Sequence, residues 1–166
     1  PTDDWNLQAS YGHLKEPELL EPGEDVRRVT ASAMYNRRLT RGNWATTFAW
    51  GRNEPEGGPA SNALLLETAF TAGPNAVFGR AEYVQKTGHD FGLDSGFEDD
   101  RLPVGGLSVG YSRQVSRSPR AVVAIGGRAF VGRVDELLEQ HRYGTATPLG
   151  GMVFVQVRPG GMHDHH

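Results

Sequence analysis

The segment NWATTFAWGR, residues 43–52, alternates large and small side chains with a period of two. Successive side chains of a β-strand point to opposite faces, so the pattern predicts a strand with one apolar face. Trp44 and Trp50 stand at the two ends of that face, about 20 Å apart at about 3.4 Å per residue. A soluble sheet buries such a row in a core, whereas an outer-membrane barrel turns it towards lipid with an aromatic residue at each interface.

The same alternation recurs along the chain and predicts eight strands of about ten residues. Only residues 134–141 suggest a helix, and a short one. The last strand gives no clear assignment of its two faces. The predicted strands are 5–14, 26–37, 43–52, 62–71, 76–86, 106–115, 120–133 and 149–158.

The connections between these segments alternate between long and short. Residues 15–25, 53–61, 87–103 and 134–146 are long and polar, whereas the connections between them are tight turns. Transmembrane barrels have short periplasmic turns and longer outer loops. The sequence therefore predicts an all-β fold, an antiparallel up-and-down β-barrel of about eight strands over residues 1–159, followed by a His-rich tail over residues 160–166.

Charged residues stand in mid-strand on the face opposite the apolar row. A soluble barrel rarely fills its centre with such residues, whereas a water-containing lumen tolerates them. Glu67 and Arg80 flank a tight turn and are expected to face each other. The predicted lumen residues are Arg28, Glu67, Arg80, Glu82 and Arg128; the predicted lipid-facing aromatics are Trp5, Tyr11, Tyr35, Trp44, Phe48, Trp50, Phe70, Tyr83 and Tyr111.

The composition removes several classes of function. The 166 residues carry a net charge of −3, which does not indicate a nucleic-acid-binding surface. Cysteine is absent, which excludes disulfide scaffolds, thiolate metal sites and cysteine nucleophiles. No apolar run approaches the roughly 18 residues of a membrane helix.

Two strings, WGRN at residues 50–53 and GRAEYV at residues 79–84, lie within a longer pattern of alternating strands that ends in YGTATPLGGMVFVQVRP. With this pattern the chain resembles the C-terminal half of bacterial porin-like outer-membrane β-barrel proteins of poorly defined function. The resemblance implies a barrel in the Gram-negative outer membrane, a passive or structural role, membrane lipid and small polar solutes as partners, and no catalytic residues. Pro1–Asp4 reads as a turn entering a strand, so we expect upstream strands and a larger barrel.

The residues are also compatible with other kinds of function. A soluble barrel would hold an apolar ligand inside the face of Trp44, Phe48 and Trp50. A barrel-embedded hydrolase would need a nucleophile and a base at one rim, for which the sequence offers Ser10, His13, His89, Asp90 and Ser95. In the tail, His163, His165 and His166 offer a weak site for a transition metal. The acidic segment from Asp90 to Asp100 lacks the spacing of a calcium-binding EF-hand.

Overall fold

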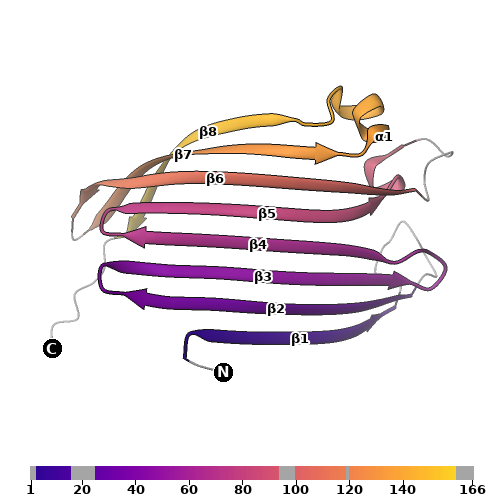
Figure 1. The fold of residues 1–166 in the computed structure, drawn as a ribbon, viewed down its shortest axis with the longest axis horizontal. Helices are drawn as coiled ribbons and strands as arrows, with labels where there is room; N and C mark the ends of the chain where they lie inside the picture. Colours follow the sequence, from indigo (N-terminus) through magenta and orange to yellow (C-terminus); the bar gives the residue numbers. More distant parts are fainter. Residues whose placement is uncertain (1–2, 16–24, 94–99, 119, 160–166) are drawn as a thin grey trace.

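The computed structural model describes residues 3–15, 25–93, 100–118 and 120–159. Nearly all of them belong to strands, with three short helical turns between strands (Figure 1). The helical turns are η1 (His89–Phe91), α1 (Glu136–Leu138) and η2 (Glu139–Tyr143). The strands are β1 (Trp5–Leu14), β2 (Val26–Leu39), β3 (Gly42–Pro55), β4 (Ser61–Ala72), β5 (Asn75–Thr87), β6 (Arg101–Arg117), β7 (Ala121–Val134) and β8 (Leu149–Pro159).

All eight strands form one antiparallel sheet in the order of the sequence, each paired with the next. The predicted all-β class and the up-and-down order are confirmed. The predicted closure is not seen: within the described residues β1 pairs only with β2 and β8 only with β7, so both strands are edges. Alternation within strands determines which residues share a face but contains no signal for how the first and last strands meet.

The connections follow the predicted alternation. Leu39 pairs with Gly42 and Ala72 with Asn75, which leaves two-residue turns. The second turn holds Gly73 at its first central position with φ of 56°, a backbone conformation that glycine adopts without strain and that a II′ hairpin requires. The tight turns lie at one end of the sheet, called here the short-turn end. The strand ends that the long connections join lie at the other end, called the loop end (Figure 1).

Several strands are longer than predicted. β6 begins at Arg101, five residues before the predicted start at Gly106, and it carries a β-bulge between Gln114 and Ser116. The predicted helix over residues 134–141 is a single turn, α1, continued by the π-helical turn η2. The apolar residues in both places pack locally against each other, which sequence periodicity does not reveal.

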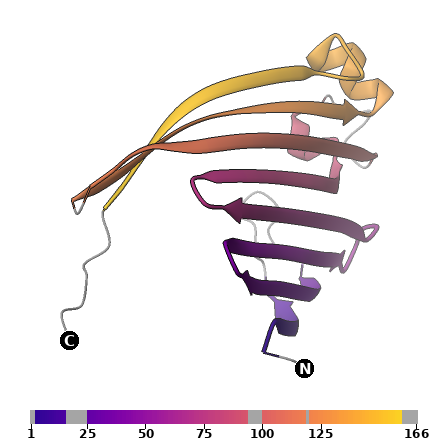
Figure 2. The ribbon, with the colours of Figure 1, turned by 60° about the vertical axis from the view of Figure 1, so that its left-hand side comes forward.

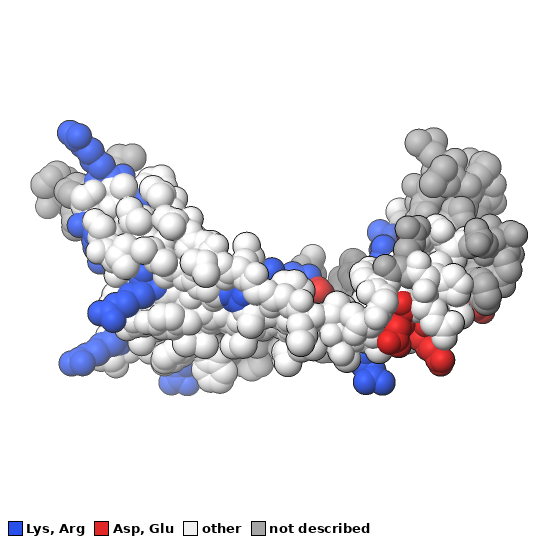
Figure 3. All heavy atoms as spheres, turned by 90° about the horizontal axis from the view of Figure 1, so that it is seen from above, with Lys and Arg blue, Asp and Glu red and all other residues white. Residues whose placement is uncertain are grey.

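The sheet is curved, with β6, β7 and β8 arcing across it (Figure 2). Seen from above, the molecule is hollowed in the middle, with charged side chains on the floor of the hollow (Figure 3). The hollowed, concave face holds the side chains of Thr47, Arg80 and Ser108. Because neighbouring residues of a strand point to opposite faces, Phe48 and its row lie on the other, convex face.

Buried apolar residues are few. Among the described residues, only Leu102, Ala124, Val134 and Leu138 are fully buried hydrophobics. Three of them form a small cluster at the loop end, where Leu138 of α1 packs against β6 and β7. Within the described ranges, the sheet itself therefore has no core on either face.

Candidate functional site on the two faces of the sheet

Arg80 lies at the centre of the concave face between two carboxylates. Its Nη1 donates to Glu67 Oε1 at 2.9 Å, and its Nη2 and Nε donate to Glu82 Oε2 at 2.7 and 2.9 Å. Glu67 is directly opposite Arg80 across the β4–β5 pair, as predicted. All three side chains are close to half exposed, so water screens the interaction.

Arg28 and Arg128 lie on the same concave face. Arg28 Nε donates to Asn53 Oδ1 at 2.8 Å across the β2–β3 pair. Arg128 lines two of the hollows that Arg80 also lines, and no acidic side chain of the described residues forms an ion pair with it. The five predicted lumen residues therefore share one face, and three of them form one ion-paired group.

The nine predicted aromatics all lie on the convex face, since the register places them in rows with one another and with aliphatic residues. Trp44, Phe70, Val77 and Tyr111 form one such row across four strands. Trp44 and Phe48 are each 45% exposed, and Val153 of β8 is 82% exposed. The strand β8, whose facing the sequence left open, presents Val153, Val155 and Val157 to the convex face.

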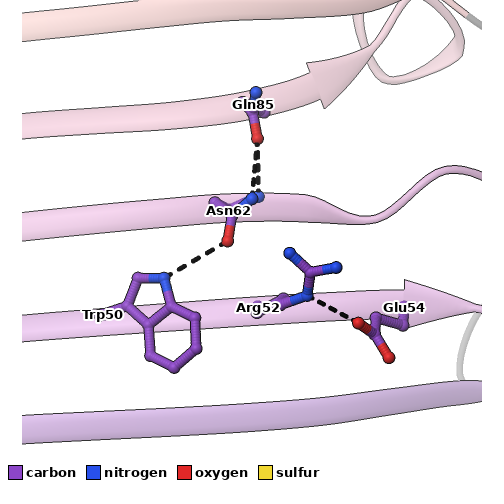
Figure 4. Close-up of polar contacts among 5 residues, drawn as sticks. All are labelled: Trp50, Arg52, Glu54, Asn62 and Gln85. Carbon is purple, nitrogen blue, oxygen red and sulfur yellow. Dashed lines mark hydrogen bonds and ion pairs between the residues drawn. The ribbon is translucent and has the colours of Figure 1, made fainter.

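The convex apolar band is bordered by aromatic residues with polar partners. At the loop end the indole Nε1 of Trp50 donates to Asn62 Oδ1 at 3.3 Å, and Asn62 Nδ2 donates to Gln85 Oε1 at 3.2 Å (Figure 4). Just beyond them, Arg52 and Glu54 form an ion pair of 2.7 Å (Figure 4). The band thus ends at this side in a line of side-chain hydrogen bonds.

A corresponding border lies towards the short-turn end. Trp44 Nε1 donates to Thr68 Oγ1 at 3.1 Å, and the Tyr111 hydroxyl donates to Asn75 Oδ1 at 2.6 Å. The Tyr35 ring lies 4.9 Å from that of Trp5 and 5.4 Å from that of Trp44. Each border therefore combines large rings with satisfied polar groups.

Sequence reasoning missed a second set of aromatic residues, on the concave face. Phe130 faces Gly150 and Phe154 faces Gly126 across β7–β8, and Phe78 faces Gly110 across β5–β6. In each pair the ring covers the glycine, where a Cβ atom would collide with it. Only the register between strands pairs these residues, and the sequence offered no signal for it.

Among the residues considered for hydrolysis, those that the structure describes are not brought together. Ser10 Oγ lies 2.7 Å from Thr30 Oγ1, and His13 Nε2 lies 3.1 Å from Asp25 Oδ2. Asp90 Oδ2 accepts from the Thr87 backbone N–H at 3.0 Å. The side chain of His89, Ser95 and most of the acidic segment lie outside the described residues.

Metal binding gains no support from the described part of the chain, where no group of three or more His, Asp or Glu side chains is arranged to hold an ion. The tail residues His163, His165 and His166 lie outside the described residues.

No helix in the described ranges has the length and apolar character needed to cross a membrane. Comparison of the chain with protein-family models, with curated proteins and with solved structures gave no match. The resemblance to porin-like barrels therefore rests on the sequence strings, and the function must be argued from the two faces.

Proposed function

We propose that the chain forms a β-barrel, or part of one, in a Gram-negative outer membrane, and that it provides a polar path for small solutes. The observation that carries the proposal is the apolar convex face. Its large side chains are exposed on every strand except β2, and the described residues provide almost no core that could bury them. Soluble monomers rarely expose a continuous apolar patch larger than a few hundred Å². In a membrane, lipid would cover the whole of such a surface.

The course of the apolar band supports this proposal. On β1 the band runs from Trp5 to Tyr11. Followed across the paired strands, Trp5 lies in the same hydrogen-bonded row as Thr46 of β3, and Tyr11 lies in the same row as Arg52. On β8 it includes Leu149, whose row is that of Phe48. The loop-side edge of the band thus moves by four residues, from the row of Arg52 to that of Phe48. Strands of a membrane barrel are tilted by about 35–45°, so a level membrane crosses their hydrogen-bonded rows obliquely.

The aromatic borders are consistent with two membrane interfaces. Trp and Tyr are favoured at interfaces because their rings are apolar while their N–H or O–H needs a polar partner. Trp50 and Trp44 have such partners in Asn62 and Thr68. Arg52 and Glu54 beyond Trp50 would lie in the headgroup region.

The concave face would then be the wet interior. Arg80, Glu67 and Glu82 are paired with one another and half exposed, an arrangement suited to water rather than to a dry core. In a lumen, the paired charges would set the local electrostatic potential, and they need no bound substrate to do so. This part of the proposal makes the role passive, with the charged group influencing which solutes pass.

The proposal requires that the edges of β1 and β8 be paired in the membrane, because unpaired backbone groups in hydrocarbon cost several kcal/mol each. Cysteine scanning tests this directly, since the chain has no cysteine of its own. Ala9→Cys on β1 would be combined in turn with cysteine at Gly151, Val153 and Val155 on β8. A disulfide within one chain indicates closure by these eight strands, whereas disulfides between chains only indicate that copies pair edge to edge.

The main experiment is refolding of the chain from urea with and without detergent micelles. Strand signal in circular dichroism only with detergent, together with heat-modifiable gel migration, is the expected result. Strand signal in plain buffer would contradict the proposal and indicate a soluble β-sheet protein.

A further inference from the structure

The two ends of the sheet differ in charge. Of the 20 acidic residues of the sequence, fifteen lie in the four long connections. At the short-turn end the described residues include seven arginines and only two acids, Asp3 and Asp4. Basic side chains accordingly gather at that end in Figure 3 and acidic ones at the opposite end. The seven arginines are Arg37, Arg38, Arg41, Arg113, Arg117, Arg120 and Arg158.

These arginines are exposed, and none of them forms an ion pair with an acid within the described ranges. The four ion pairs of those ranges lie at the loop end or at the centre of the concave face. Arg37 lies beside Asp4 and the Tyr35 side chain. The short-turn end thus keeps most of its positive charge uncompensated, in a chain whose net charge is −3.

Four of the seven arginines are positioned beside the apolar band. Arg37 is directly opposite Trp44 on the convex face, and Arg113 is directly opposite Asn75, the partner of the Tyr111 hydroxyl. Arg41 and Arg120 lie in the tight turns just beyond. In a membrane, positions one step outside an aromatic border are at the depth of the lipid phosphates.

We propose that Arg37, Arg41, Arg113 and Arg120 form a binding surface for the phosphates of anionic phospholipids. A guanidinium group donates in a planar fork that matches phosphate oxygens. The surface binds headgroups of the leaflet at the short-turn end and thereby favours one orientation of the sheet in the membrane. This inference rests on the proposed membrane location and adds a lipid class to it.

The test compares unfolding of the full chain in phosphatidylcholine vesicles with and without phosphatidylglycerol, using urea and the gel shift as readout. We expect phosphatidylglycerol to favour the inserted state of the wild type. In the double variant R37Q/R113Q the preference should fall by about five-fold for each arginine removed. Added salt should weaken the preference in the wild type, because it screens exposed charges.

The matched control is R27Q/R133Q, which removes two exposed arginines that share the convex face but lie at the loop end. It should retain the preference. The inference would be overturned if both double variants lost the preference equally, or if phosphatidylglycerol had no effect on the wild type. In either case, insertion into phosphatidylcholine vesicles would still support the membrane proposal. Failure to insert into either vesicle would instead refute the membrane location itself, and the inference with it.

Discussion

On the concave face, the half-exposed side chains of Arg80, Glu67 and Glu82 have partners within the sheet, whereas on the convex face equally exposed apolar side chains have none that cover them. Arg80 is 46% exposed and is held by two carboxylates. Phe48, 45% exposed, lies between Ala33 and Leu66 on the neighbouring strands and has its outer side open. The comparison indicates that the charged group around Arg80 is satisfied within the sheet, while the apolar side chains of the convex face are left open.

The largest expected effect comes from placing a charge on the convex face. Phe48→Arg puts a guanidinium at the centre of the apolar band, which costs about 2–4 kcal/mol if that face meets lipid. We expect loss of most of the heat-modifiable folded form in micelles, measured by urea titration with the gel shift.

The neighbouring residue provides the control. Thr47→Arg places the same side chain on the concave face, directly opposite Glu67, where water and an acid are available. It should change the urea midpoint little, and Glu67→Leu on that face should also be tolerated. Equal destabilisation by Phe48→Arg and Thr47→Arg would remove the distinction between the two faces.

A second expected effect separates two adjacent glycines. Gly126 is on the concave face, where a Cβ atom would approach the Tyr111 carbonyl oxygen to 2.7 Å and the Ser112 Cβ to 2.8 Å. Gly127 is on the convex face, and its nearest contact would be the Met152 carbonyl oxygen at 3.5 Å. Gly126→Ala should therefore lower the free energy of unfolding by about 1–3 kcal/mol. Gly127→Ala should change it by no more than about 0.5 kcal/mol. Similar urea midpoints for the two variants would show that the concave face is not closely packed there.

The sequence determined which residues share a face because strands have a fixed period of two. It also predicted that Glu67 faces Arg80, since the two-residue turn Gly73–Pro74 fixes the register of β4 and β5. Turn length and alternation are local properties, so they can be read from neighbouring residues. The eight strands and the alternating connections followed from the same properties.

What could not be predicted depends on residues far apart in the sequence. The rings of Phe130 and Phe154 over Gly150 and Gly126 follow from the β7–β8 register, which a long connection does not fix. Whether β1 meets β8 depends on the total curvature of the sheet, to which every strand contributes. The facing of β8 was unclear because its middle residues, from Met152 to Val155, are all apolar.

A smaller effect is expected from the charged group of the concave face. Arg80→Met leaves Glu67 and Glu82 uncompensated, whereas Arg128→Met removes a cation that no described acid pairs with. Since exposed ion pairs contribute about 0–1 kcal/mol, stability should change little in either variant. Ion selectivity is measured in planar bilayers as the reversal potential under a salt gradient. Both variants should shift this potential towards cation selectivity, and Arg80→Met should shift it further than Arg128→Met. Unchanged selectivity in both variants would argue that this face does not line the solute path.

The smallest expected effect concerns the border of the apolar band at Trp50. Trp50→Phe keeps an aromatic ring but removes the N–H that donates to Asn62 at 3.3 Å, a bond worth about 0.5–1.5 kcal/mol. Asn62→Ala removes the acceptor of the same bond, so the double variant should be less destabilised than the sum of the single variants. The free energies of unfolding in micelles give this coupling. Because Asn62 also joins Gln85, the single variant Asn62→Ala should cost more than Trp50→Phe. Strict additivity would mean that the indole N–H is bound by water instead, and that Trp50 stabilises the border through its ring alone.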